Sequence, residues 1–123
     1  MKERNVIQVK SYNFALRVVK LYIYLQKRNE YQLSLQILKS GTSIGANIEE
    51  AIGGSSQKDF KFKLQIAYRE ARETNYWLRL LKDSLILEKN IAISLLDDVN
   101  ELLKLLTAIL NSLRKNSIHS TVS

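Results

Sequence analysis

The chain contains no cysteine, no proline, one histidine and only four glycines in 123 residues. Without cysteine it can form no disulfide, thiolate metal site or iron–sulfur cluster, and it has no thiol nucleophile. The single histidine, His119, lies in a polar C-terminal segment, which argues against a serine–histidine–aspartate triad and excludes zinc sites that need two histidines. The scarcity of turn-forming residues argues strongly against an all-β fold.

Long apolar runs are also absent. No charge-free stretch approaches the ~20 apolar residues that a membrane-spanning helix requires. The N-terminal sequence MKERNVIQVKSYNF lacks the continuous hydrophobic region of a signal peptide. We therefore expect a cytoplasmic protein with no membrane partner, and the 46% hydrophobic and 25% charged residues are typical of an ordinary globular domain.

Apolar residues recur at alternating spacings of three and four, which is the pattern of amphipathic helices. The most regular row runs from Phe60 through Leu64 and Ala67 to Leu81 and Leu85. Short loops between long helices favour an all-α, antiparallel, up-down-up-down four-helix bundle. The predicted helices cover residues 8–28, 31–53, 57–84 and 88–115, within one domain over 1–116 that is followed by a frayed polar tail over 117–123.

The glycines mark two features of the second helix. Gly41 lies within its apolar row, which predicts either the close approach of another helix or a local kink near Gly41 to Gly45. Gly53 and Gly54 are expected to end this helix in the left-handed conformation. Ser56, with Asp59 three residues later, resembles a capping box at the start of the third helix.

The charge balance favours anionic partners. The chain has a formal net charge of +7 and a pI near 9.7, and rows of Lys and Arg at helical spacing follow single faces of the first and third helices. Such rows suit a phosphate backbone, which they would position without reading its sequence. A solvated face, a membrane surface and an acidic protein remain alternatives. The candidate nucleic-acid-binding residues are Lys10, Arg17, Lys20 and Lys27 on the first helix, and Lys58, Lys61, Arg72, Arg79 and Lys82 on the third.

Polar residues also share one face of the second helix, from Gln36 and Ser40 onwards. Because Ser and Asn are poor residues for a helix interior, their alignment predicts a hydrogen-bonded seam toward the third helix. A ligand or catalytic site is the alternative. The predicted structural polar seam consists of Ser43, Asn47, Glu50, Glu70 and Glu73.

One enzyme class shares part of this pattern. All-α nucleotide pyrophosphohydrolases bind magnesium through a Glu-Glu-x-x-Glu cluster on one helix and Glu-x-x-Asp on the next. Here Gly53 stands where the third acid of Glu49-Glu50 would fall, and Arg69 and Arg72 are interleaved with Glu70 and Glu73. We therefore expect no enzyme, no metal and no cofactor, and this hydrolase is the least favoured alternative.

The apolar surface of the first helix is wider than one bundle needs. Beside its inner row lies a second apolar row, formed by Tyr12, Leu16, Val19 and Ile23. Large exposed apolar strips mark association sites. The sequence therefore predicts self-association into a homo-oligomer.

The second and third helices carry a family resemblance. Gln36-Ile37, the stretch Ser43 to Ala51 (SIGANIEEA), the following Gly-Gly-Ser turn and the stretch Phe60 to Leu81 resemble the bacterial four-helix bundle proteins encoded in intervening sequences of 23S ribosomal RNA genes. The family often has proline where this chain has Gly45, so the local geometry of the second helix there is open.

The resemblance implies a non-enzymatic bundle that assembles into a five-membered ring. The chain is also similar to the accessory variability proteins of diversity-generating retroelements, which are basic barrels that associate with a reverse transcriptase and nucleic acid. A ribosomal RNA or reverse-transcriptase context is therefore implied. The expected function is non-catalytic nucleic-acid binding by a homo-oligomer, with RNA favoured, and the alternative is a protein-interaction scaffold without nucleic-acid affinity.

Overall fold

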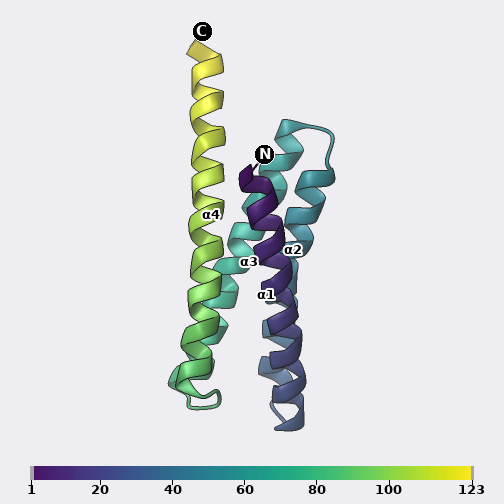
Figure 1. The fold of residues 1–123 in the computed structure, drawn as a ribbon, viewed down its shortest axis with the longest axis vertical. Coiled ribbons are helices and arrows are strands. Elements are labelled where there is room, and N and C mark those ends of the chain that lie inside the picture. The colour runs from purple at the N-terminus through teal and green to yellow at the C-terminus, as the bar shows by residue number, and fades with distance from the viewer. Residues whose placement is uncertain (1, 123) are drawn as a thin grey trace.

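The computed structural model describes the backbone of residues 2–122 and the side chains of residues 6–116. Four antiparallel helices form a bundle in which each helix packs against the next and α1 also packs against α4 (Figure 1). Among these residues no Cα atom of α1 lies within 8 Å of one in α3, and none of α2 lies within 8 Å of one in α4, so these pairs are diagonal. The predicted all-α four-helix arrangement is confirmed. The helices are α1 (Lys2–Lys27), α2 (Tyr31–Gly53), α3 (Gln57–Asp83) and α4 (Lys89–Val122).

The predicted apolar rows supply the core. On α3 the alternating row from Phe60 to Leu81 is buried without interruption, and Val18 on α1 and Val99 on α4 are fully buried among the same residues. Leu85 is the exception, because α3 has already ended and this side chain is 88% exposed. Burial of the remaining rows is the main favourable contribution to folding.

The close approach predicted at Gly41 is confirmed, and α2 is a continuous helix through Gly41 and Gly45. A Cβ atom added at Gly41 would lie 2.7 and 2.8 Å from the two methyl carbons of Val18 on α1. At Gly45 the nearest atom is the Ser11 carbonyl oxygen at 3.4 Å, which is an ordinary contact. Gly41 therefore lets α1 and α2 approach each other.

The helix ends follow the sequence only in part. Ser56 caps α3 as predicted, because its Oγ accepts a hydrogen bond from the Asp59 amide at 3.0 Å. α2 ends at Gly53, but Gly54 is extended (φ −73°, ψ 161°), and no described glycine has a positive φ. The left-handed residues are instead Asn29 (φ 65°) and Leu85 (φ 63°), in the turns that follow α1 and α3. The predicted left-handed glycine cap is therefore wrong.

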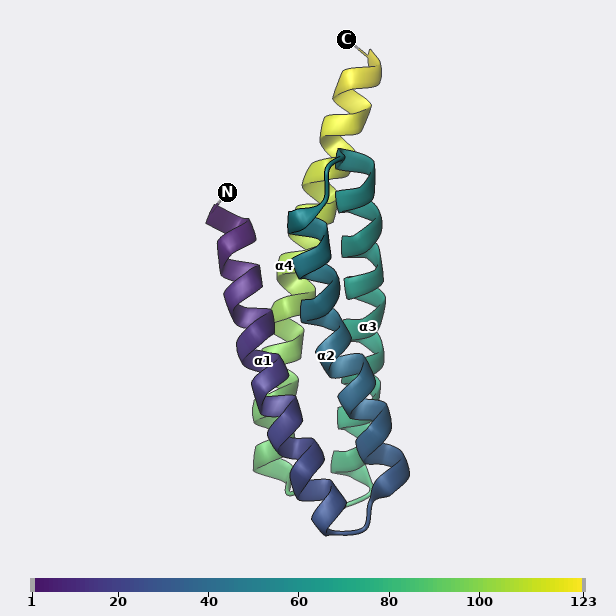
Figure 2. The same cartoon turned by 90° about the vertical axis from the view of Figure 1, so that its right-hand side faces the viewer.

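α4 is longer than predicted. It continues to Val122 rather than ending near residue 115, because no proline or glycine follows Gly54 in the sequence to stop it. Its C-terminal part projects past the other three helices (Figure 2). The predicted frayed tail is thus helical as far as Val122, while the side chains of 117–123, including His119, lie outside the described residues. No described helix is long and apolar enough to span a bilayer.

Candidate nucleic-acid interface

Five predicted basic residues of α3 lie along one flank of that helix. The buried row of α3 faces the core, so the basic residues occupy the solvent side. Asn75, which shares their spacing, donates a hydrogen bond from Nδ2 to Asn100 Oδ1 on α4 at 2.9 Å, and this contact places the flank beside α4. The α3 basic row, as we define it, consists of Lys58, Lys61, Arg72, Arg79 and Lys82.

Most of the α3 basic row is available to a ligand. Arg79 Nε donates to Asn75 Oδ1 at 2.8 Å, and its guanidinium lies 5.8 Å from the centre of the Tyr76 ring. Lys82 Nζ is 3.7 Å from an Asp83 carboxylate oxygen, a long and exposed contact. Within residues 6–116, the other three cations of the row make no ion pair. A row so arranged presents several unpaired positive charges to solvent.

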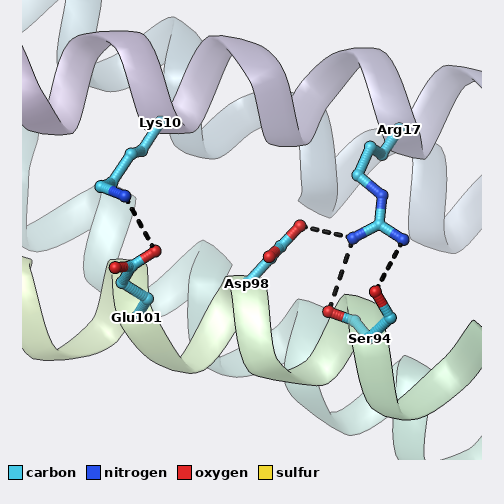
Figure 3. A network of polar contacts seen from close by, with 5 residues as sticks. All are labelled: Lys10, Arg17, Ser94, Asp98 and Glu101. Atoms are coloured by element: carbon cyan, nitrogen blue, oxygen red, sulfur yellow. Dashed lines mark hydrogen bonds and ion pairs between the residues drawn. The ribbon is translucent and has the colours of Figure 1, made fainter.

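The α1 basic residues are placed differently from the prediction. Arg17 pairs with Asp98 on α4 at 2.5 Å and also donates to the side chain of Ser94 at 3.1 Å. Lys10 Nζ lies 3.2 Å from a carboxylate oxygen of Glu101 (Figure 3). This side of α1 carries no acid of its own, but α4 supplies the carboxylates that pair with two of its four candidate cations.

The remaining α1 candidates, Lys20 and Lys27, are exposed and make no ion pair within the described residues. The side chains of Arg17 and Asp98 remain 38% and 42% exposed, so their pair is a surface contact rather than a buried one. Such pairs are weak, at about 0–1 kcal/mol. Even so, they neutralise two of the four predicted charges on α1.

α4 separates the two basic flanks. The contacts of Arg17 and of Asn75 place both flanks next to α4, on opposite sides of it. The outer surface of α4 between them carries the acids Asp97, Asp98 and Glu101 together with the cation Lys104. The α1 and α3 basic residues therefore do not merge into one positive surface within a single copy.

The polar seam is only partly as predicted. Ser43 and Asn47 donate hydrogen bonds to backbone carbonyls of α2, at 2.6 and 2.8 Å, so their bonds stay within their own helix. Glu50 pairs with Lys63 of α3 at 3.2 Å, and Glu73 accepts a bond from Trp77 Nε1 at 3.1 Å. In the described residues no hydrogen bond joins Ser43, Asn47 or Glu50 to Glu70 or Glu73.

The buried polar link between α2 and α3 is instead a pair of hydroxyl groups. Ser40 and Thr74 are about 1% and 0% exposed, and their hydroxyl oxygens are hydrogen-bonded at 2.9 Å. The Thr74 hydroxyl also donates to the Glu70 carbonyl oxygen at 2.7 Å. The signal in the sequence was Thr74 itself, a polar residue within an otherwise apolar row.

Glu70 is a carboxylate with a perturbed environment. Partial burial and the neighbouring Glu73 carboxylate raise the pKa of Glu70 above its usual value, and the nearby Arg69 opposes this only in part. The other acids of the hydrolase pattern are engaged separately, since both carboxylate oxygens of Glu49 accept bonds from Gln8 Nε2. Among the described residues no group of three potential metal ligands comes together.

Comparison with known proteins agrees with this architecture. The family model of the 23S rRNA-intervening sequence protein matches residues 3–108. The chain belongs to this family. The match spans all of α1 from residue 3, all of α2 and α3, and most of α4, so it includes every predicted basic residue.

A solved structure supports the same assignment. The chain is similar to a protein of unknown function from the S23 ribosomal protein family of Bacteroides thetaiotaomicron, with 45% sequence identity and a TM-score of 0.86. The similarity covers 89% of this chain and 98% of that one. No curated protein matches the chain.

Proposed function

We propose that this family member is a non-catalytic, self-associating cytoplasmic protein that binds nucleic acid, with RNA favoured, along the α3 basic row. The observation that carries the proposal is the set of cations on α3 without a carboxylate partner, chiefly Lys58, Lys61 and Arg72. Unpaired lysines and arginines release condensed counterions when they contact phosphates, which is the main source of sequence-independent affinity.

The row has the length of a phosphate track. Lys58 and Lys82 are separated by 24 residues of one helix, which corresponds to ~36 Å at about 1.5 Å per residue. Between the cations, Tyr68 is partly buried against the core and the Asn75 amide is bonded to Asn100 and Arg79, so the cations themselves supply the contacts to phosphates. The row therefore fits an extended strand better than a small anion.

α4 extends this positive flank. Asn75 contacts Asn100 in an antiparallel pair. Counting 14 residues back from Asn75 and 14 forward from Asn100, we infer that Lys61 and Arg114 are at the same level. Fourteen residues are two heptads, so both residues return to the same flank. Arg114 would then contact the same strand as Lys61.

The preference for RNA rests on the family to which the chain belongs. The family takes its description from 23S rRNA, and the similar Bacteroides thetaiotaomicron protein is assigned to the S23 ribosomal protein family. A ribosomal RNA setting is accordingly favoured over a reverse-transcriptase complex, which the resemblance also implies.

Self-association is supported by the outer surface of α1. Tyr12, Leu16 and Ile23 are 61%, 48% and 48% exposed, although their spacing is that of a packed helix seam. A five-membered ring is the assembly that the family resemblance implies. The alternative function, a protein-interaction scaffold without nucleic-acid affinity, draws on the same apolar surface and on the neutralised charges of Lys10 and Arg17.

The binding proposal is tested by fluorescence anisotropy with a labelled single-stranded RNA and a matched DNA duplex. Raising the salt from 50 to 200 mM is expected to lower wild-type affinity by orders of magnitude. A variant with Arg72→Gln and Arg79→Gln is expected to bind at least tenfold more weakly, at about 0.7 kcal/mol or more per lost charge. Weak binding that does not respond to salt would favour the scaffold.

The matched control removes the same charge from α1. Lys10→Gln with Arg17→Gln also lowers the net charge by two, but these residues already pair with Glu101 and Asp98. We expect its affinity to fall less than that of the α3 variant. Equal losses would mean that net charge, rather than the α3 basic row, governs binding. Magnesium-dependent hydrolysis of nucleoside triphosphates, abolished by Glu70→Gln, would contradict the non-catalytic proposal.

A further inference from the structure

The outermost side of α1 is apolar along most of its length. Its core side is occupied by residues such as Ile7, Phe14 and Val18. On the opposite side a second row follows the same alternating spacing and stays 40–61% exposed. The α1 outer face, as we define it, consists of Val9, Tyr12, Leu16, Val19 and Ile23.

The charges beside the α1 outer face all have one sign. From residue 6 to residue 27 the sequence has no Asp or Glu. Lys10 and Arg17 are held by α4, which leaves Lys20 and Lys27 exposed at the edge of the apolar surface. A surface that complements it would be apolar and carry carboxylates.

A second outward row of α3 has those properties. It lies on the α2 side of that helix, where Lys63 contacts Glu50, and is distinct from the α3 basic row. Phe62, Tyr76 and Leu80 are 53%, 47% and 38% exposed. The α3 outer face, as we define it, consists of Phe62, Ile66, Arg69, Glu73, Tyr76 and Leu80, alternately four and three residues apart, together with the adjacent Glu70 and Trp77.

The centre of the α3 outer face carries excess negative charge. Glu70 and Glu73 stand beside Arg69, which only partly offsets the effect of burial and of Glu73 on Glu70, while the Arg79 guanidinium lies over the Tyr76 ring at the edge of the face. Trp77 packs edge-on against Tyr76 with ring centres 5.1 Å apart, and its Nε1 holds Glu73 in place. The result is an aromatic surface with two carboxylates at its centre and a cation at its edge.

From this match in polarity and charge we propose that the α1 outer face of one copy packs on the α3 outer face of the next. Leu16 and its neighbours would cover Tyr76 and Leu80, and Lys20 or Lys27 would approach Glu70 and Glu73. This proposal rests on the proposed self-association and specifies its interface.

The proposed contact joins two different surfaces. Pairing α1 with a second α1 would bring lysines and arginines together without an acid between residues 6 and 27. Pairing two α3 outer faces would bring the Glu70 and Glu73 carboxylates of both copies together, with Arg69 as the cation beside them. A contact between unlike surfaces propagates from copy to copy and ends only when the ring closes. It leaves most of the α3 basic row, on the α4 flank, outside the interface, while Arg79, whose guanidinium lies over the Tyr76 ring, stands at its edge.

The first experiment measures mass in solution by light scattering. Wild type is expected to be a closed oligomer, and Leu16→Lys and Tyr76→Lys are each expected to be monomers. Leu35→Lys is the matched control, because Leu35 is 41% exposed on α2 and belongs to neither face. Circular dichroism and urea unfolding of each variant show that the bundle is intact. If wild type is a monomer, the proposed self-association itself fails; if wild type assembles and Leu16→Lys still assembles, only this interface fails.

The second experiment uses the absence of cysteine from the chain. Lys20→Cys and Glu73→Cys proteins are treated with a short bis-maleimide, separately and as an equimolar mixture, and the products are identified by mass. We expect a mixed cross-linked pair and little self-linking of either protein alone. Self-linking of the Lys20→Cys protein, with no mixed product, would show that α1 faces α1 and overturn the proposal.

Discussion

Replacing Gly41 with alanine tests whether α1 and α2 approach as closely as the structure shows. The new Cβ would lie 2.7 and 2.8 Å from the methyl carbons of Val18, about 1 Å closer than the ~3.5–4.0 Å optimum for two carbon atoms. Val18 is fully buried, and a β-branched side chain in a helix has essentially one rotamer. The two helices must therefore move apart, or Val18 must strain.

The expected change in the free energy of unfolding for Gly41→Ala is the sum of two opposing effects. Overpacking of a core costs about 1–3 kcal/mol, and the stiffness of Val18 places this site in the upper part of that range. Replacing glycine by alanine within a helix stabilises the helix by about 1 kcal/mol. The net expectation is that Gly41→Ala lowers the free energy of unfolding by about 1–2 kcal/mol, measured by urea unfolding at fixed protein concentration.

Two variants control this measurement. Gly53→Ala places its Cβ where no atom lies within 4 Å, so it is expected to leave stability unchanged or to raise it slightly. Val18→Ala removes the clashing methyl groups, so the double variant with Gly41→Ala should lose less stability than the two single losses combined. Wild-type or greater stability in Gly41→Ala would refute the close-approach reasoning and favour a purely conformational role for the glycine.

The remaining predictions concern a turn, a carboxylate and an ion pair. Leu85→Gly removes a left-handed leucine that is 88% exposed, and urea unfolding should show a gain of about 1 kcal/mol; a loss would mean that Leu85 packs in the assembly. The pKa of Glu70 is raised in the folded state by burial and by Glu73. Folding stability should therefore fall as the pH rises from the ordinary pKa of a glutamate through the raised pKa of the folded protein. Glu70→Gln should remove this fall and be more stable than wild type at neutral pH, which unfolding at a series of pH values checks; an unchanged pH profile would contradict it. A double-mutant cycle on Arg17 and Asp98 should give a coupling of about 0.5–1 kcal/mol, since both side chains are over a third exposed; a coupling of several kcal/mol would contradict the surface character of the pair.

The sequence predicted the core because periodicity is a local property. The row from Phe60 to Leu81 records which side of α3 meets its neighbours, and it needs no knowledge of the other helices. Leu85 continues the spacing but not the burial, because the amides of Ile86 and Leu87 turn back to the Leu81 carbonyl oxygen at 3.1 and 3.0 Å. Spacing alone does not show that the helix has already ended.

The candidate site was harder to predict because charges pair across helices. Arg17 and Asp98 are 81 residues apart, and their meeting depends on the register that the three intervening connections impose on α1 and α4. The same reason explains the polar seam, where Ser40 rather than Ser43 meets Thr74. Charge rows on one helix therefore predict a basic flank only when the facing helix brings no acids.

The salt dependence of RNA binding tests the central claim most directly. Each phosphate contact to single-stranded RNA contributes a slope of about 0.7 to the decrease of log affinity with log salt. If Arg72 and Arg79 contact phosphates, the variant with both changed to glutamine should lose about 1.4 from the wild-type slope. A slope equal to that of wild type would contradict the assignment of nucleic-acid binding to the α3 basic row.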